Sequence, residues 1–458
     1  MSEPVSLVWF RRDLRLSDHP ALAAAARRGR VVGVFVADEA LLASAGATRR
    51  AYLASVLATL QRATHGALSI RVGEPGAQLL ALAGEVGASA LYATTDAAPY
   101  GRERDARVQV LLKDAGLDVH WIDSNYVVAP GTLRTSSAQP YRVFTPFRRA
   151  WWGEVRLDVT RVPDVGWRPT SGESPALVGQ LGGTRRPWYF ADLADGPAPI
   201  GPVGELAAAR RLEEFAATAG DYARRRNRPD LAGTSRLSAD LRFGVLHPRQ
   251  ALNVVGEDAF VSEIAWREFY ADVLWHWPES ARRALSDLDG RLDVDRDEPA
   301  QARFALWARG QTGYPLVDAG MRQLLGEGWM HNRVRMVAAS FLVKHLHLDW
   351  RWGARWFMWR LVDADLASNQ HGWQWCAGLG TDAAPFHRIF NPTLQAERFD
   401  PDGTYIRRWV PELAGLAAPL VHQPGAGGWA PGYPAPMIDL AEERREALAR
   451  WARARGRA

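Results

Sequence analysis

Apolar and polar positions alternate along the first part of the chain in a pattern that predicts short buried strands separated by helices. The predicted strands cover residues 5–10, 31–36, 67–72, 88–94 and 117–122. The predicted helices between them cover residues 21–28, 48–63, 77–86 and 102–115. This order is typical of a doubly wound parallel sheet. The sequence therefore predicts an N-terminal α/β domain with a sheet of five strands.

The pattern changes further along the chain. Residues 128–203 are rich in proline, glycine, serine and threonine, which predicts a connector that lies over the surface. After Gly204 the apolar positions recur at helical spacing to the end of the chain. We therefore expect an α/β domain over 1–127, the connector over 128–203 and an all-α domain over 204–458.

The composition is that of a soluble globular protein. The chain has 458 residues, of which 47% are hydrophobic and 23% are charged. Its apolar runs are shorter than a bilayer span and its first residues lack the order of a secretory signal, so we expect a cytoplasmic protein without membrane contacts. The single cysteine, Cys376, excludes an internal disulfide, and no spacing of ligand residues predicts a metal site.

Two features of the composition leave more than one interpretation open. Arginine greatly outnumbers lysine, which occurs only at Lys113 and Lys344, and this suits contacts with nucleic-acid phosphates but also fits a codon bias. The chain also contains 20 tryptophans. They could form a large aromatic core, stacking surfaces for bases or a flavin, or a chain of redox-active rings.

Four segments of the second half concentrate polar and stacking side chains. Residues 233–238 place hydroxyl groups and an arginine before a helical pattern, as a phosphate site requires, although an ordinary helix cap looks the same. Glu263 and Trp266 share one helix face, and residues 328–336 place further polar and aromatic side chains on another helix. Residues 363–375 contain acids, amides and two tryptophans, which are costly to bury unless a polar heterocycle satisfies them.

Together these segments resemble the photolyase and cryptochrome family, most closely the class I cyclobutane pyrimidine dimer photolyases. The resemblance runs from Leu7 to about Pro411. It rests on motifs that occur in the family's order, namely Leu7–Leu16, Tyr141–Phe147, Gly233–Ser238, Thr381–Pro385 and Phe390–Pro392. It implies an α/β antenna domain joined to an all-α domain that binds FAD, in agreement with the pattern of elements.

The resemblance also assigns roles to individual residues of the helical domain. FAD would be held by Tyr222, Thr234, Ser235, Arg236, Leu237, Ser238, Arg267, Trp329, Arg335, Asp363, Asp365 and Asn369, with Arg335 paired to Asp363. The catalytic pocket for a flipped-out pyrimidine dimer would be formed by Glu263, Trp266, Asn332, Met336 and Trp375, with Asn369 facing the flavin. Phosphates of UV-damaged DNA would contact Arg226, Arg333 and Arg388.

The implied function is light-dependent DNA repair by a monomeric lyase, in which excited reduced FAD passes an electron to the dimer. Family members that act on (6-4) photoproducts carry two histidines where this chain has Asn332 and Met336, and plant cryptochromes carry an aspartate where it has Asn369. These differences favour the repair of cyclobutane dimers. The alternatives are a cryptochrome-type blue-light photoreceptor that signals through protein partners, and single-strand or (6-4) specificity.

The chain departs from the family pattern at two places. The family's photoreduction chain matches at Trp373 and Trp350, but its outermost position falls near residues 294–297, which contain no tryptophan. Photoreduction could instead exit through Trp352, Trp356 or Trp359, or be inefficient. Residues 99–105 also lack the Asn-Glu pair of folate-binding members, so we prefer 8-hydroxy-5-deazaflavin as the antenna chromophore over folate, FMN or an empty pocket.

Overall fold

The computed structural model describes residues 3–170, 201–382, 388–426 and 430–456, and every structural statement below refers to these residues. Part of the expected connector, residues 171–200, lies outside them. The Thr381–Pro385 motif is described only at Thr381 and Asp382.

The N-terminal part of the chain forms the predicted parallel sheet. Its strands are β1 (Val5–Phe10), β2 (Arg30–Ala37), β3 (Leu68–Val72), β4 (Ala88–Thr95) and β5 (Asp118–Ser124), in the spatial order β3-β2-β1-β4-β5. All four neighbouring pairs are parallel. The five-stranded α/β domain expected from the sequence is thereby confirmed, because the strands are buried on both faces and read as nearly continuous apolar runs.

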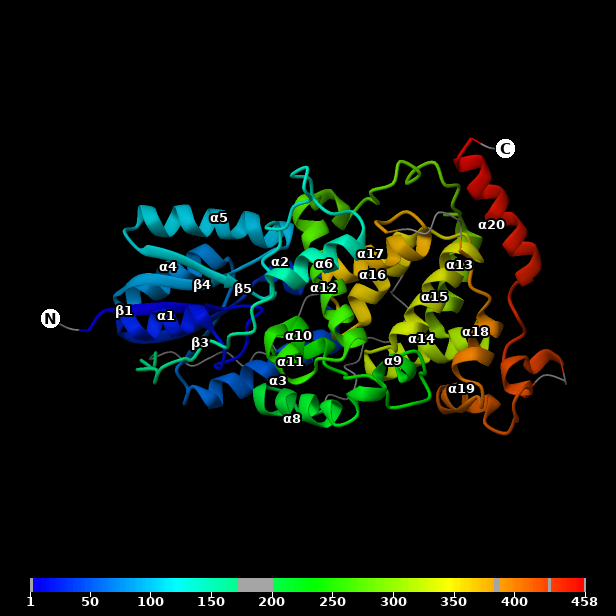
Figure 1. The fold of residues 1–458 in the computed structure, drawn as a ribbon, viewed down its shortest axis with the longest axis horizontal. Coiled ribbons are helices and arrows are strands. Elements are labelled where there is room, and N and C mark those ends of the chain that lie inside the picture. Colours follow the sequence, from blue (N-terminus) through cyan, green and yellow to red (C-terminus); the bar gives the residue numbers. More distant parts are fainter. Residues whose placement is uncertain (1–2, 171–200, 383–387, 427–429, 457–458) are drawn as a thin grey trace.

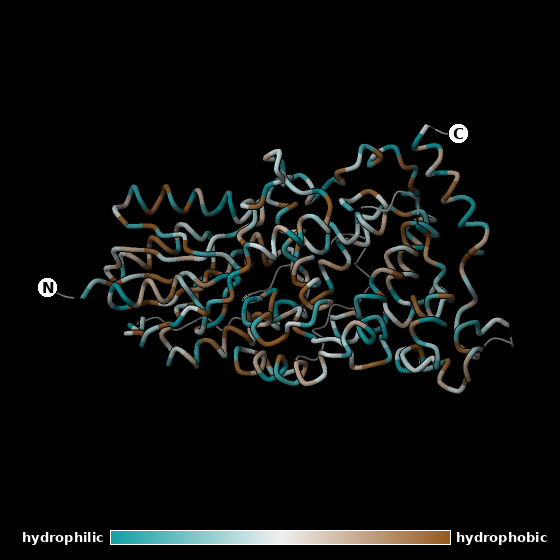
Figure 2. Tube along the Cα trace, viewed as in Figure 1, coloured by the Kyte–Doolittle hydropathy of each residue, from teal (hydrophilic) through white to brown (hydrophobic). Residues whose placement is uncertain are grey.

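Helices cover both faces of this sheet (Figure 1). They are α1 (Pro20–Arg28), α3 (Ala47–Ala63), α4 (Pro75–Val86) and α5 (Pro99–Asp114), with the short α2 (Glu39–Leu42) in addition. Trp9 packs in the core with α4 and α5, whereas its neighbour Phe10 packs in the core with α1 and α3. Helices α4 and α5 begin earlier than the apolar pattern predicts, because Pro75 and Pro99 fit the first helical position. In Figure 2 the outer helix α5 alternates between hydrophilic and hydrophobic colours, as expected for a helix that packs on one side.

The described chain from Gly204 onward is mainly helical, as predicted. From Gly204 onward its helices are α8 (Glu205–Ala216), α9 (Tyr222–Arg225), α10 (Ser238–Phe243), α11 (Pro248–Val254), α12 (Asp258–His276), α13 (Glu298–Arg309), α14 (Pro315–Glu327), α15 (Asn332–Lys344), α16 (Trp350–Arg360), α17 (Leu366–Ala377), α18 (Pro392–Phe399), α19 (Thr404–Trp409) and α20 (Leu440–Ala454). Figure 1 shows α20 at the far end of the molecule from the sheet.

One helix lies where the sequence analysis expects only a connector. Helix α6 (Phe144–Glu154) buries Phe147 and Trp151, and it packs against α12. Trp151 donates its ring N–H to the buried carboxylate of Glu268 at 2.5 Å, and that carboxylate also accepts the backbone N–H of Val127 at 2.6 Å. The expectation was wrong here because the prolines and glycines around α6 hid a short amphipathic segment, in which Pro146 is tolerated in the first turn.

The loop after β1 joins the sheet to the helical region. Leu14 donates its backbone N–H to the carbonyl of Phe243 at 3.2 Å, and Arg15 donates to the carbonyl of Gly244 at 3.1 Å. Gly244 has a φ of 64°, and a side chain there would collide with the backbone of Arg12. The two halves therefore meet through a close backbone contact that fixes where the loop lies.

Candidate functional site

The polar segment before α17 brings two acids and two arginines into one place. Asp363 is only 6% exposed, and its Oδ2 accepts a hydrogen bond from Arg335 at 2.8 Å. Arg335 in turn donates to the carbonyl of Met330 at 2.8 Å. The other carboxylate oxygen of Asp363, Oδ1, is buried and has no hydrogen-bond partner among the described residues. Leaving such an oxygen unpaired is costly, so the site is suited to a ligand that donates a hydrogen bond there.

Asp365 lies two residues further on and is paired with the sheet domain. Its Oδ2 accepts from Arg12 at 2.6 Å, and its Oδ1 accepts from the backbone N–H of Ser368 at 3.0 Å, which caps α17. Burial acts to raise the pKa of Asp365, but the charges of Arg12, Arg242 and Arg267 outweigh burial and hold this pKa well below its usual range. Asp365 therefore stays ionised.

Two of these arginines also bind backbone carbonyls around the acids. Arg242 donates to the carbonyl of Ala364 at 2.7 Å, and burial together with the charge of Arg12 lowers its pKa to about 9. Arg267 donates to the carbonyl of Asn125 at 3.2 Å and lies 4.4 Å from the ring of Tyr126. Asp365 is thus surrounded by cations from three separate segments of the chain.

The hydroxyl-rich segment 233–238 contacts Trp329, which lies between α14 and α15. Ser238 accepts a hydrogen bond from the ring N–H of Trp329 at 3.2 Å, and the guanidinium of Arg236 lies 3.6 Å from the centre of that ring. Thr234, Ser235 and Ser238 are half-buried, Leu237 is buried in the core and Arg236 is exposed. Since Trp329 also lies 5.8 Å from Arg335, this segment adjoins the acid site.

Helix α12 presents Glu263 and Trp266, both half-buried. Glu263 pairs with Arg226 at 2.6 Å, and burial raises the pKa of Glu263 although Arg226 opposes the shift. Arg226 lies 5.8 Å from the ring of the buried Tyr222. Trp266 is stacked on Phe144 of α6, with ring centres 3.7 Å apart and planes at 8°. The sequence analysis missed Phe144 as a site residue, because it belongs to the helix that was read as connector.

Helices α15 and α17 contribute the remaining residues predicted for the lesion pocket. Asn332 is exposed, while Met336 and Trp375 are half-buried and the two helices pack against each other. Arg388 lies 5.9 Å from the ring of Trp375. Arg333 donates to the side chain of Asn227 at 2.8 Å, in the turn that follows Arg226. The residues predicted for the lesion pocket thus fall into two groups. Glu263 and Trp266 lie on α12, and Asn332, Met336 and Trp375 lie on α15 and α17.

Helix α17 also carries Asn369, which is predicted to face the flavin, and Trp373, which is predicted to transfer electrons together with Trp350 of α16. Asn369 donates to the carbonyl of Ala354 at 3.0 Å, which fixes the direction of its side-chain oxygen. Trp373, one turn further along α17, is buried and contacts the rings of Phe357 and Trp307. Trp350 is also buried, and its ring N–H lies 3.5 Å from Asp289.

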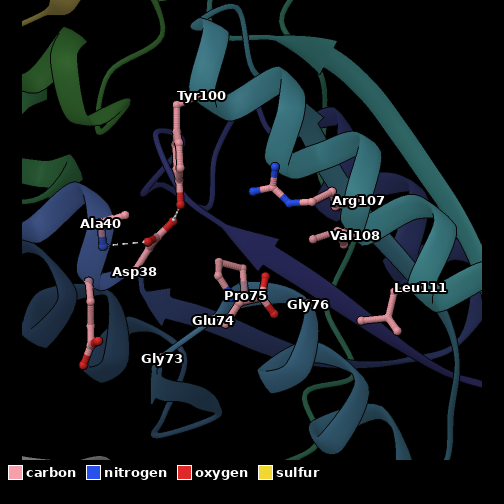
Figure 3. A pocket seen from close by; sticks show the side chains of 11 residues that line it. Asp38, Ala40, Gly73, Glu74, Pro75, Gly76, Tyr100, Arg107, Val108 and Leu111 are labelled. Carbon is pink, nitrogen blue, oxygen red and sulfur yellow. Dashed lines mark hydrogen bonds between the residues drawn. The ribbon is translucent and has the colours of Figure 1, made fainter.

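A cavity in the sheet domain, separate from the acid site, lies at the carboxyl ends of β2 and β3, as expected for an open α/β sheet. It encloses about 580 Å³ and is lined by residues of the loops after these strands and by α5. Tyr100 donates its hydroxyl to Asp38 at 2.7 Å, and Figure 3 shows Arg107, Val108 and Leu111 on the opposite wall. The cavity thus combines three acids (Asp38, Glu39 and Glu74), a single cation and an apolar surface.

No group of three or more histidine, cysteine, aspartate or glutamate side chains that could bind a metal ion occurs in the described parts of the chain. Within the same residues, no helix has the length and apolar character needed to cross a bilayer.

Comparisons with known proteins agree with this arrangement. Residues 6–165 match the family model described as DNA photolyase, and residues 260–453 match the model described as the FAD binding domain of DNA photolyase. The chain is 38% identical to a deoxyribodipyrimidine photo-lyase of Synechococcus, over 96% of this chain and 94% of that protein. It is 40% identical to the deoxyribodipyrimidine photo-lyase of Thermus thermophilus, over 96% of this chain and 97% of that protein.

Solved structures of similar proteins share the fold over nearly the whole length. A class III photolyase from Agrobacterium tumefaciens has a TM-score of 0.85 and 36% identity, and covers 100% of this chain and 98% of its own. An archaeal photolyase from Sulfolobus tokodaii with two FAD molecules has a TM-score of 0.81 and 28% identity. The match covers 98% of this chain and 99% of that protein. A cryptochrome of Synechocystis has a TM-score of 0.85 and 29% identity. The match covers 98% of this chain and 99% of that protein.

Replacing Arg12 by methionine tests the charge pairing of Asp365. We expect the free energy of unfolding near neutral pH to fall by about 2 kcal/mol, because a buried carboxylate loses one of its partners. The depressed pKa of Asp365 stabilises the fold above its unfolded value of ~3.9, and this contribution is lost as the pH falls through the lower folded value. The difference between wild type and variant should therefore be largest above about pH 4 and shrink below it.

Urea denaturation at a series of pH values measures this difference. The control is Arg27→Met, at an exposed position of α1, which should change stability by no more than about 0.5 kcal/mol. A destabilisation by Arg12→Met that is the same at every pH would contradict the assignment.

Proposed function

Because the chain belongs to the DNA photolyase family, we propose that it repairs UV-damaged DNA by splitting cyclobutane pyrimidine dimers with the energy of light. The observation that carries this proposal is the enclosed acid site before α17, where Asp363 has a buried oxygen with no partner among the described residues. The similarity to photo-lyases of other organisms, at 38% and 40% identity over nearly the whole chain, supports the same function. We further propose that the enzyme acts as a cytoplasmic monomer.

The residues around the acid site fit FAD. The unpaired oxygen of Asp363 suits the imide N–H of a flavin ring, which is a hydrogen-bond donor. The hydroxyl and guanidinium groups of Thr234, Ser235, Arg236 and Ser238 suit a diphosphate. Tyr222, Leu237, Arg267, Trp329, Arg335, Asp365 and Asn369 would complete the site. When bound and reduced, FAD supplies the electron that light makes available to the substrate.

The chain's own contribution is to hold and shield the reacting groups. Asn369 is an amide, so it can hydrogen-bond to a neighbouring ring but does not supply a proton as an aspartic acid would. The ion pair of Arg335 with Asp363 places a positive charge beside the site, where it offsets developing negative charge. No general base or nucleophile is needed, since bond cleavage follows from the transfer of an electron.

The dimer pocket would be formed by Glu263, Trp266, Asn332, Met336 and Trp375. Stacking on Phe144 fixes the plane of Trp266, and a fixed aromatic plane is suited to stack on an extruded base. Glu263, which Arg226 contacts at 2.6 Å, would hydrogen-bond to a pyrimidine of the dimer.

Three arginines of the helical domain would bind the DNA backbone. Arg226 and Arg333 are held by Glu263 and Asn227, and Arg388 lies beside Trp375. Phosphate contacts of this kind position a DNA strand without reading its sequence. They suit an enzyme whose substrate is defined by a lesion and not by a base sequence.

We also propose an antenna chromophore in the cavity at the carboxyl ends of β2 and β3. Asp38, Tyr100 and Arg107 would bind the polar edge of a flat ring. Val108 and Leu111 would contact its face (Figure 3). We favour 8-hydroxy-5-deazaflavin over folate or FMN, because an ionised ring hydroxyl would pair with Arg107. The Sulfolobus tokodaii photolyase, whose second FAD is described as a light-harvesting cofactor, supports a flavin-like ligand.

Repair is tested by mixing the protein, carrying chemically reduced FAD, with an oligonucleotide that contains a thymine dimer. Under blue light we expect the thymine absorbance to recover, and in the dark we expect no recovery. Absence of recovery from protein with fully reduced flavin would contradict the repair function and leave signalling as the better proposal.

Glu263→Ala should weaken the binding of dimer-containing DNA about ten- to a hundredfold, because the loss of one hydrogen bond to a charged or partly buried group costs about 1.5–3 kcal/mol. The amount of FAD bound per protein should not change, and Glu263→Gln should lose less affinity. Glu214→Ala, at an exposed position of α8, is the control. Loss of flavin from Glu263→Ala during purification would place Glu263 in the cofactor site instead.

Arg107→Ala should reduce the affinity for 8-hydroxy-5-deazaflavin about tenfold, because a charge-assisted hydrogen bond is lost. A fluorescence titration measures this affinity, and Arg210→Ala on the exposed face of α8 is the control. Tighter binding of FMN or folate to the wild-type protein would show that another chromophore is preferred, and an unchanged affinity in Arg107→Ala would place the chromophore elsewhere.

A further inference from the structure

A continuous line of aromatic rings leads from Trp373 towards the surface of the helical domain. The ring of Trp373 lies 6.1 Å from that of Trp307 on α13, in an edge-to-face arrangement at 72°. Trp307 contacts Phe304, one turn earlier on the same helix, at 5.6 Å. Phe304 then contacts Trp352 on α16 at 5.7 Å. Three tryptophans from three helices are thereby connected through one phenylalanine.

The burial of these rings changes along the line in the direction that electron transfer requires. Trp373 and Trp307 are buried, and Phe304 is only 1% exposed. The ring N–H of Trp307 donates to the carbonyl of Ala338 at 3.1 Å, so this indole has no direct route for its proton to water. Trp352 is half-buried, so part of this residue reaches the surface of the helical domain. The positive charge left by the loss of an electron is therefore better stabilised by solvent at Trp352 than at the fully buried Trp307.

The route through Trp350 is less favourable in this chain. The guanidinium of Arg351 lies 4.8 Å from the ring of Trp350, and a positive charge there disfavours the removal of an electron. The position that would follow Trp350 falls at Val294, Asp295, Arg296 or Asp297, none of which is redox-active. Two other tryptophans of α16, Trp356 and Trp359, are almost fully buried at 1% and 4% exposure.

We infer that Trp307 and Trp352 are the electron relays that reduce the flavin in this protein, with Phe304 as the bridge between them. The inference rests on the proposed FAD site. When light excites bound oxidised FAD, Trp373 would donate one electron to it. Trp307 would then donate one electron to Trp373, and Trp352 would donate one electron to Trp307. Trp352 then releases its indole proton to water. A thiol in solution returns one electron and one proton to Trp352, and is itself oxidised.

The test follows two signals in the full-length protein with oxidised FAD, blue light and a thiol. Trp352→Phe and Trp307→Phe should each slow the loss of oxidised-flavin absorbance at least about tenfold, which corresponds to a modest rise in the barrier. They should also remove the long-lived neutral tryptophan radical from time-resolved electron paramagnetic resonance. Trp359→Phe, on the same helix as Trp352, is the matched control and should keep both signals.

Trp350→Phe decides between the two routes. We expect it to slow photoreduction less than Trp352→Phe does. A strong loss in Trp350→Phe together with a normal rate and a normal radical signal in Trp352→Phe would overturn the inference. Repair by the wild-type protein with chemically reduced FAD is measured separately, so a failure of the repair function is distinguished from a failure of the route.

Discussion

The ion pair between Arg12 and Asp365 connects the sheet domain to the helix that carries most of the site. A buried carboxylate requires compensating charge, and here that charge comes from the loop after β1, from α10 and from α12. Asp365 also caps α17 through Ser368, so the same contact fixes where the helix begins. Since Asn369, Trp373 and Trp375 follow on α17, the docking of the two halves and the shape of the site depend on one another.

Local patterns predicted the elements of the fold well, because each strand and helix is specified by nearby residues. The strands of the sheet were found almost to the residue, since parallel strands buried on both faces are short and uniformly apolar. Helix α6 was missed, because its two buried side chains are too few to give a clear period among prolines and glycines. Its packing depends on Glu268, which lies more than a hundred positions further along the chain.

The site shows the same division. Resemblance to a family named its residues, and the structure brings Arg335 to Asp363, Trp329 to Ser238 and Arg226 to Glu263. The sequence did not predict that Arg12 would pair with Asp365 or that Phe144 would stack on Trp266. No period or spacing links residues that meet only after the chain has folded. Such long-range partners determine charge and orientation at the site, which are the properties that chemistry uses.

The abundance of tryptophan has more than one cause in this structure. Trp151 and Trp307 are fully buried and act as large core residues that also satisfy polar groups, through Glu268 and the carbonyl of Ala338. Yet a core built from indoles in edge contact is also a medium through which electrons can move. A structural role and a redox role therefore do not compete for Trp307. What separates a relay from a core residue is continuity with a ring that reaches water, and on α16 that condition distinguishes Trp352 from the buried Trp356 and Trp359.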